Sequence, residues 1–367
     1  MTVSTTEFEP YIGEVDKTRL IDTYKGRKTD RVPNNEILIE DKHVTAILGR
    51  EAGNTLSVGG DVAKGADKVT TEMRPMYPQD YIELCEIIGQ DFICLENLWT
   101  PIKRRNPDGT IEPWVDRSFR TAEDLDSIVW PGEEDLNKTI VYVREYVEAA
   151  KGTRIGVMLL SGCIFQTLYE FVVGLEDFMI MTMLEQDLVK ELLSKSADYY
   201  QELHTRAVAE GIDILFAADD VAFKTGLFVD PAIFKDLWRE SYQRVLDPAL
   251  GADVPIKFHS DGKLDDIAEM LIDMGIDCLN PMDPYGIDYK EYKKRYGSRV
   301  TLSGNIDIEF PLVRGTPEEV EQDVIKHCES LKEGGRWEFA SSHSVVNYIP
   351  HENFITMINA IHKYGKF

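Results

Sequence analysis

Eight short apolar segments, separated by longer stretches with a helical pattern, constrain the fold of this chain more than any other feature. Most of them are apolar almost throughout, which is typical of parallel strands buried on both faces. They are Asn35–Ile39, Asp91–Leu98, Ile155–Ser161, Ile214–Asp219, Ile256–His259, Cys278–Asn280, Val300–Ser303 and Trp337–Ala340. The alternation predicts a parallel α/β sheet, and eight repeats favour a closed (β/α)8 TIM barrel over an open sheet. No GxGxxG motif follows the first segment, which weakens a dinucleotide-binding alternative.

The barrel is predicted to form one catalytic domain over residues 31–367, because α/β barrels of this length commonly remain single domains. Residues 1–30 precede the first apolar segment, and we expect an N-terminal helical extension that packs outside the barrel. Arg104–Val115 contains the turn sequence Asn-Pro-Asp-Gly and is predicted to form a β-hairpin.

Helical patterns fill the intervals between the apolar segments. We predict helices over Tyr81–Ile88, Leu136–Ala150, Phe165–Gly211 (at least two), Pro231–Leu246, Leu264–Met274, from Thr316 onward, and over Glu352–Tyr364. Asp230 is suited to be an N-cap, with Pro231 in the first turn. Thr316 and Glu319 have the spacing of a capping box, and Gly275 is suited to follow a helix end.

The chain is strongly acidic, with 40 Lys and Arg against 65 Asp and Glu and a formal net charge of −25. Such a charge repels phosphate backbones and anionic lipid, so neither nucleic acid nor a membrane is expected as a partner. The five cysteines are scattered without a CxxC motif, and the first residues lack the apolar run of a signal peptide. These features favour the reducing cytoplasm.

Polar side chains gather where the predicted strands end. They are Glu96, Asn97, Ser161, Asp219, Asp220, His259, Asp261, Asn280, Asn305, Asp307, Ser341, Ser342 and His343. In a (β/α)8 barrel the carboxyl ends of all strands meet at one face, where the active sites of such enzymes lie. We therefore expect these residues to converge on one site.

A metal site is one reading of the histidines among them. His259 and Asp261 are two residues apart at a strand end, and with His343 they offer two imidazoles and one carboxylate for zinc. The alternative is that both histidines hydrogen-bond a ligand or are ordinary barrel residues.

The carboxylates divide into predicted roles. Asp219 and Asp220 are adjacent, so their side chains point to opposite faces of a strand and only one is expected to act in catalysis. We assign that role to Asp220, and Asp219 either contacts substrate or holds a neighbouring element. Glu96 is a general acid, a metal ligand or an ion-pair partner. Cys163 has no basic neighbour in the sequence and is interpreted as structural.

The remaining candidates would bind substrate. Trp99, Tyr285 and Tyr348 follow strand ends and either line a pocket for an aromatic ligand or simply pack. Asn280 and Asn305 follow the sixth and seventh strands and could hydrogen-bond a ligand there.

Several motifs together resemble the uroporphyrinogen decarboxylase superfamily over roughly residues 20–367. They are Gly226-Leu-Phe-Val-Asp-Pro231, His259-Ser-Asp-Gly262, Gly275-Ile-Asp-Cys-Leu-Asn-Pro281, Leu302-Ser-Gly-Asn-Ile306 and Ser342-His343 with the later Pro350-His-Glu-Asn353. The resemblance implies a (β/α)8 barrel, in agreement with the apolar segments, and a homodimer. It also implies one of two activities.

The decarboxylase branch binds a porphyrinogen with many carboxylates through an arginine-rich N-terminal motif. The corresponding stretch here, residues 31–40, holds one arginine and two glutamates. The other branch contains corrinoid-dependent methyltransferases, in which the coenzyme M and methanol members bind zinc through a His-x-Cys pair and a later Cys. This chain has Asp261 in place of the first cysteine and His343 near the place of the second.

The loss of both thiolates favours an oxygen-bound methyl group over a thiol substrate, since soft sulfur ligands suit thiol alkylation better. The chain looks most like the substrate methyltransferase component of anaerobic O-demethylases. That resemblance implies a methoxylated aromatic substrate, a partner corrinoid protein that carries cobalamin, and possible use of zinc. The alternatives are a decarboxylase, a methyltransferase for another small methylated substrate, and a non-catalytic barrel that binds an aromatic ligand.

Overall fold

The computed structural model describes residues 8–56 and 76–367, and its strands form one seven-stranded sheet with parallel pairing. In sheet order they are β1 (Phe92–Trp99), β5 (Gly156–Cys163), β6 (Ile214–Ala218), β9 (Ile256–His259), β10 (Cys278–Asn280), β11 (Thr301–Ser303) and β12 (Trp337–Glu338). Seven of the eight predicted apolar segments are therefore confirmed as strands. Their central side chains are buried on both faces, as a parallel sheet covered by helices requires.

The first predicted strand, Asn35–Ile39, is wrong as a continuous strand. The segment forms isolated parallel bridges instead, from Asn34 to both Gln90 and Phe339 and from Ile39 to Val345. The reason is that the N–H groups of Glu36 and Ile39 donate to the side chains of Gln90 and Thr55. These two hydrogen bonds take the place of the backbone bonds of a parallel ladder. Asn34 still bridges residues next to β1 and β12, the two edge strands, so this segment occupies the eighth position of a (β/α)8 barrel.

Contacts divide the chain into two compact units. The first unit comprises Met1–Glu96, Glu148–Met158 and Asp277–Phe367, and the second comprises Asn97–Val147 and Leu159–Ile276. The assignment of residues 31–367 to a single catalytic domain stays a prediction.

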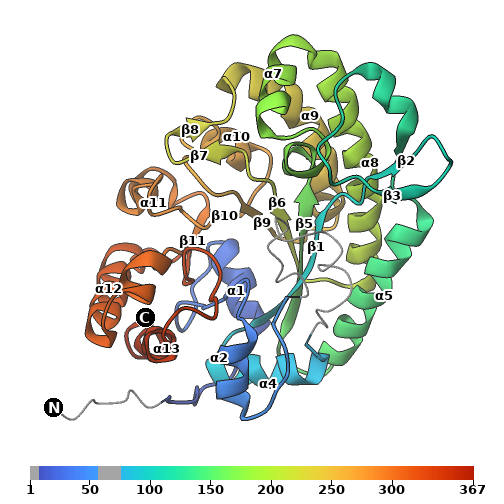
Figure 1. Ribbon diagram of the computed structural model, residues 1–367. Coiled ribbons are helices and arrows are strands. Elements are labelled where there is room, and N and C mark those ends of the chain that lie inside the picture. The colour runs from blue at the N-terminus through green and yellow to red at the C-terminus, as the bar shows by residue number, and fades with distance from the viewer. Residues whose placement is uncertain (1–7, 57–75) are drawn as a thin grey trace. The chain divides into compact units, whose positions relative to one another are not determined.

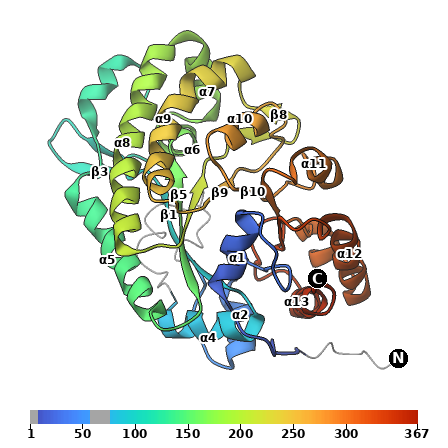
Figure 2. The same ribbon diagram turned by 180° about the vertical axis from the view of Figure 1, so that it is seen from behind.

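The first unit carries the helices from both ends of the chain. They are α1 (Lys17–Tyr24), α2 (Asp41–Leu48), α4 (Pro78–Ile88), α11 (Tyr289–Tyr296), the π-helical turn η4 (Ile308–Val313), α12 (Pro317–Leu331) and α13 (His351–Tyr364). The predicted capping box begins α12, where the side chain of Thr316 accepts from Glu319 N. Helices α12 and α13 pack side by side (Figure 2).

The second unit holds the helices from α5 to α10. They are α5 (Glu133–Ala150), α6 (Phe165–Thr167), the π-helical turn η3 (Leu168–Val172), α7 (Leu175–Leu184), α8 (Gln186–Glu210), α9 (Pro231–Gly251) and α10 (Ala268–Asp273). The long helices α8 and α9 run beside each other (Figure 1). The predicted N-cap of α9 is confirmed, because the carboxylate of Asp230 accepts from Ala232 N and Ile233 N. Gly275 adopts φ +95° beyond α10, a conformation that favours glycine.

The second unit also contains short antiparallel strands outside the main sheet. The predicted hairpin is confirmed as β2 (Lys103–Arg105) and β3 (Ile111–Pro113). On its other side β2 pairs with β4 (Ile128–Val129), which follows the 3-10 turn η2 (Ala122–Ser127). A second hairpin, β7 (Ala222–Phe223) with β8 (Gly226–Leu227), follows directly after the Asp219-Asp220 pair. Within the described ranges, every helix is too short or too polar to cross a bilayer.

Candidate active site

Three predicted site residues meet in the second unit, just beyond the ends of β6 and β9. The two strands pair in a register that sets Ala218 opposite His259, so the residues after them are neighbours. The Nε2 atom of His259 lies 3.8 Å from an oxygen of Asp220 and 3.9 Å from an oxygen of Asp261. The side chain of His259 is 14% exposed, and those of Asp220 and Asp261 are 22% and 39% exposed. The cluster is therefore partly desolvated but open to a ligand.

Asp220 is held in place by donors on both of its oxygens. Asp261 N donates to Oδ1 at 2.8 Å, and the side-chain amide of Gln166 donates to Oδ2 at 3.0 Å. The amide oxygen of Gln166 in turn accepts from Asp220 N at 3.3 Å and from the thiol of Cys163 at 3.3 Å. These contacts fix the orientation of the amide and suit an ionised Asp220. The sequence analysis missed Gln166, because a single glutamine after a strand carries no distinctive signal.

Asp219 points away from the cluster into the protein. It is fully buried, and its carboxylate accepts from Phe165 N, from Gln166 N and from the indole N–H of Trp238. Burial raises the pKa of Asp219 to about 7, while these donors act in the opposite direction. The adjacent carboxylates thus contact different partners, as the alternation of side chains along a strand predicts. A role for Asp219 in substrate binding stays a prediction; its contacts are those of a scaffold.

Aromatic side chains of the second unit are also among the candidates. Trp99 packs edge-to-face on Phe171, with ring centroids 4.9 Å apart and planes at 83°. The sequence analysis did not single out Phe223, which is 50% exposed on the β7–β8 hairpin. The backbone oxygen of Phe223 accepts from the N–H of Lys263 at 2.8 Å. Lys263 follows Asp261 by two residues, so the backbone of Phe223 lies beside the loop that carries Asp261. Gly262 permits the close approach, because a Cβ there would come within 2.5 Å of Ala222 O.

Aromatic side chains connect Phe223 to the cluster from the other direction. Phe223 packs edge-on against Phe228, with ring centroids 4.3 Å apart, and the ring centroids of Phe228 and Tyr169 are 5.4 Å apart. The hydroxyl of Tyr169 donates to Asp220 O at 3.1 Å. An apolar wall therefore borders one side of Asp220.

Most of the other predicted site residues belong to the first unit. Asn280 donates to Ser303 Oγ at 2.9 Å, and Asn305 donates to Met282 O and accepts from His327 Nε2. The hydroxyl of Tyr285 donates to Asp307 Oδ2 at 3.0 Å, and the side chain of Tyr348 is 67% exposed. His343 Nδ1 lies 3.0 Å from Ser344 Oγ, and Glu96 lies in β1. That these residues share a site with His259 stays a prediction.

The three-residue cluster fits a divalent cation. One ligand atom from each of Asp220, His259 and Asp261 lies within 4.8 Å of the others, and it is the one such group of His, Cys, Asp or Glu among the described residues. One imidazole and two carboxylates form a nitrogen and oxygen set that suits zinc and harder divalent ions. The predicted set was His259, Asp261 and His343, so the structure adds Asp220, and His343 stays a prediction.

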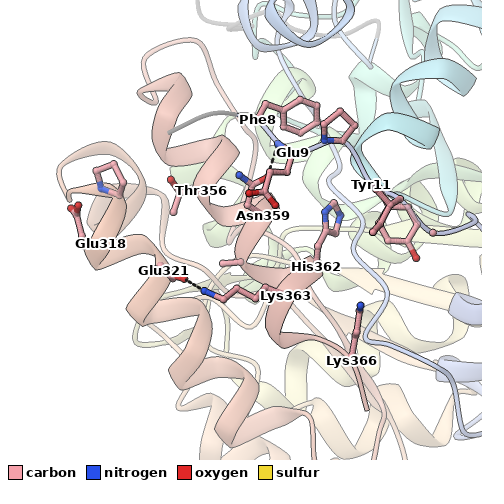
Figure 3. A pocket seen from close by; sticks show the side chains of 15 residues that line it. Phe8, Glu9, Tyr11, Glu318, Glu321, Thr356, Asn359, His362, Lys363 and Lys366 are labelled. Atoms are coloured by element: carbon pink, nitrogen blue, oxygen red, sulfur yellow. Dashed lines mark hydrogen bonds and ion pairs between the residues drawn. The ribbon is translucent and has the colours of Figure 1, made fainter. Parts of the chain in front are cut away.

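A cavity of about 960 Å³ lies in the first unit, between residues 8–13 and helices α12 and α13 (Figure 3). Several of its polar groups are engaged with each other or with backbone. Glu9 N donates to Asn359, Lys363 pairs with Glu321 at 3.0 Å, and His362 Nε2 donates to Ile88 O. We therefore do not assign the chemistry to this cavity.

The stability of the protein is expected to fall in acid because of a buried histidine in the second unit. His204 Nδ1 donates to Val245 O, and Nε2 accepts from the hydroxyl of Ser161. Burial lowers the pKa of His204 from 6.5 to about 4. The unfolded imidazole binds a proton more readily, so its contribution to stability is complete above pH 6.5 and is lost as the pH falls towards 4. We expect a loss of about 3 kcal/mol from this group.

Urea unfolding at pH 7.5, 6.0 and 4.5 measures this effect in the wild type and in His204→Gln, whose amide can bond both partners. The variant should take up about one proton fewer on unfolding in this range. Parallel pH profiles for the two proteins would show that His204 is not the titrating group.

Comparison with known proteins decides the family. The family model described as uroporphyrinogen decarboxylase (URO-D) matches residues 102–364. The chain belongs to the URO-D family. The resemblance inferred from the motifs is confirmed.

URO-D relatives of two kinds are similar to the chain. It is 26% identical over 260 residues to a uroporphyrinogen decarboxylase of Methylobacillus flagellatus, covering 68% of this chain and 71% of the relative. It is 24% identical over 355 residues to the methylcobamide:CoM methyltransferase MtaA of Methanosarcina barkeri, covering 95% and 98%. Among solved structures, a methyltransferase from Methanosarcina mazei superposes with a TM-score of 0.66 at 18% identity, covering 96% and 99%. This last likeness shows that the two proteins share a fold.

Proposed function

We propose that this chain is a corrinoid-dependent methyltransferase that removes a methyl group from a methoxylated aromatic and passes it to the cobalt of a partner corrinoid protein. The observation that carries the proposal is the Asp220–His259–Asp261 cluster, a nitrogen and oxygen donor set after β6 and β9. The match to MtaA along nearly the whole of both chains supports the methyltransferase branch. The absence of thiolate from the cluster favours an oxygen-bound methyl group.

The arrangement of Arg31 opposes the decarboxylase alternative. Arg31 is the single arginine of the stretch that resembles the substrate motif, and it is 4% exposed. Its guanidinium donates to Gly89 O, Asn34 and Tyr11, and it lies 3.4 Å from Asp91. A cation engaged in this way is not available to bind the carboxylates of a porphyrinogen.

In the proposed reaction the ether oxygen is the leaving group and must be protonated or polarised. A reduced corrinoid on the partner supplies a nucleophilic cobalt that accepts the methyl group. The bond between the methyl carbon and the oxygen breaks, the oxygen keeps the electron pair, and a proton must then reach it. Both oxygens of Asp220 already accept N–H groups, so His259 and Asp261 are the members of the cluster able to deliver that proton. A divalent ion held by the cluster would polarise the same oxygen as a Lewis acid.

The aromatic side chains of the hairpin have a corresponding role. Phe223 exposes half of its surface beside the loop of Asp261, and the ring of a methoxylated aromatic would pack against it. Glu96 and His343 remain as further proton donors, and Trp99, Tyr285 and Tyr348 as further contacts to the ring.

Gln166 acts in this proposal by positioning Asp220. We expect Gln166→Ala to weaken zinc binding about 10- to 100-fold, because a ligand loses the group that orients it. The turnover number should fall more than KM for the ether changes. Competition with a chromophoric chelator measures the affinity, and Gln243→Ala on α9 is the matched control. Equal zinc affinity in both variants would contradict the positioning role.

Mixing the purified protein with a reduced corrinoid protein and guaiacol tests the proposal. Loss of the cob(I) absorption together with release of catechol is the expected result. Parallel reactions contain a methylated thiol or a methylated amine. Turnover of either, without reaction of any methoxyaromatic, would assign the enzyme to another substrate class. Release of carbon dioxide from a carboxylic acid without any corrinoid would support the decarboxylase instead, and metal analysis of the same sample tests for zinc.

A further inference from the structure

A second cavity, of about 990 Å³, lies in the first unit at the beginning of β12. It is lined by the chain after α1, by the last turns of α12, by the loop that leads into Trp337 and by the last residues of the sequence. Active sites of (β/α)8 barrels lie at the carboxyl ends of the strands, whereas this cavity lies at an amino end. The catalytic proposal therefore makes no use of it.

The charges in this cavity are the reverse of those of the whole chain. Arg27, Lys28, Lys332 and Arg336 line it, against Glu329 and Glu333. Arg27 is paired with Asp22 at 2.9 Å. Within residues 8–56 and 76–367, no carboxylate oxygen lies within 4.0 Å of the charged nitrogens of Lys28, Lys332 or Arg336. Three cations without a close counter-charge are notable in a chain with 65 acidic and 40 basic residues.

Arg336 is the centre of this group. Its Nη1 donates to Tyr24 O at 2.8 Å, and its guanidinium lies against Gly26, where a Cβ would come within 2.4 Å of it. This contact caps the end of α1, but it uses one of the five N–H donors of a guanidinium. Burial lowers the pKa of Arg336, and the charge of Asp277 acts in the opposite direction without offsetting it.

The loop before Arg336 holds it in a strained conformation. Gly334 and Gly335 have φ of +78° and +69°, and Arg336 itself has φ +48°, which is unfavourable for a residue with a side chain. Lys293 donates to Gly335 O, and burial together with the charge of Arg336 lowers the pKa of Lys293 to about 8. Glu333 acts on Lys293 in the opposite direction, but the pKa remains lowered. The two cations thus destabilise each other, and a bound anion would relieve that cost.

The rest of the cavity wall is apolar. Ile325, Cys328, Tyr364 and Phe367 contribute to it, and Trp337 closes its inner end. A guanidinium recognises carboxylate or phosphate through paired hydrogen bonds, and the apolar side chains suit a hydrocarbon or aromatic body.

We propose that this cavity binds a small organic anion, whose carboxylate or phosphate group contacts Arg336 and Lys28 and whose apolar part packs against Ile325, Cys328 and Phe367. The site is independent of the Asp220–His259–Asp261 cluster and of the proposed methyl transfer.

Titration of the full-length protein with 4-fluorobenzoate, followed by fluorine NMR, tests this site. We expect saturable binding that weakens as salt is raised from about 50 to 500 mM, since the contact is between opposite charges. Arg336→Gln should weaken binding about tenfold or more, and Lys28→Gln should weaken it to a smaller extent. Arg314→Gln, which removes an exposed arginine paired with Glu309 outside the cavity, should leave binding unchanged. His259→Gln should also leave it unchanged, which separates this site from the proposed active site.

Two further ligands test the chemistry of the proposal. Neutral 4-fluorobenzamide and inorganic phosphate should both bind more weakly than 4-fluorobenzoate. The proposal is overturned if the amide binds as well as the acid, if phosphate competes as well as the acid, or if Arg336→Gln and Lys28→Gln both bind it with wild-type affinity. Lys28→Gln keeps the test available should Arg336→Gln fail to fold, because Lys28 has no structural contact comparable to that of Arg336 with Tyr24.

Discussion

Replacing His259 with glutamine is expected to lower kcat/KM for methyl transfer from guaiacol by about 10²- to 10⁴-fold, the range that positioned acid–base groups contribute. The imidazole lies 3.8 Å and 3.9 Å from two carboxylates, and a glutamine amide in its place cannot deliver a proton to the ether oxygen. Asp261→Asn should lower the rate by a smaller factor, since the amide keeps the shape of the side chain and loses its charge. Stopped-flow decay of the cob(I) absorption measures both rates.

Asp266→Asn is the matched control for these variants, because Asp266 is an exposed carboxylate that follows the same loop. It should retain the wild-type rate. Circular dichroism checks that each variant is folded. A folded His259→Gln protein with wild-type kcat/KM would remove the cluster from the reaction.

Asp219→Ala is expected to destabilise the protein by about 3 to 5 kcal/mol, because it leaves three buried N–H donors without an acceptor. Two of them begin α6 and the third belongs to Trp238 of α9, so the substitution loosens two elements of the second unit. Asp219→Asn should cost less, because one amide oxygen can still accept. Urea unfolding monitored by tryptophan fluorescence measures the loss.

Asp236→Ala provides the comparison on α9. Asp236 is 63% exposed and pairs with Lys190, so its removal should cost less than about 1 kcal/mol. An unfolding midpoint of Asp219→Ala equal to that of Asp236→Ala would contradict the scaffolding role of Asp219.

The fold could be predicted from the sequence because burial on both faces leaves a plain pattern. Strands such as Gly156–Cys163 and Ile214–Ala218 are apolar runs with few polar residues, and their helices carry local caps. Asn35–Ile39 has a similar apolar character, but two of its N–H groups donate to the side chains of Gln90 and Thr55. Both partners lie outside the segment, and Gln90 is distant in the sequence. No local pattern signals that competition.

The candidate site could be predicted in part for a similar reason. His259, Asp261 and Asp220 follow strands that were predicted correctly, so their convergence follows from the register of β6 and β9. Gln166 and Phe223 could not be singled out, because their proposed roles depend on contacts with Asp220 and Lys263 that only the folded loops create. A glutamine or phenylalanine is common elsewhere, whereas histidine and paired aspartates are conspicuous in a sequence.

The fate of a labelled methyl group tests the central claim most directly. Guaiacol carrying carbon-13 in its methoxy group is mixed with the wild-type protein and a reduced corrinoid protein, and carbon NMR follows the label. Our account predicts that the label moves to the corrinoid protein, with one catechol formed for each methyl group transferred. Formation of catechol without labelled corrinoid, or no reaction with guaiacol alongside rapid transfer from a methylated thiol, would contradict it.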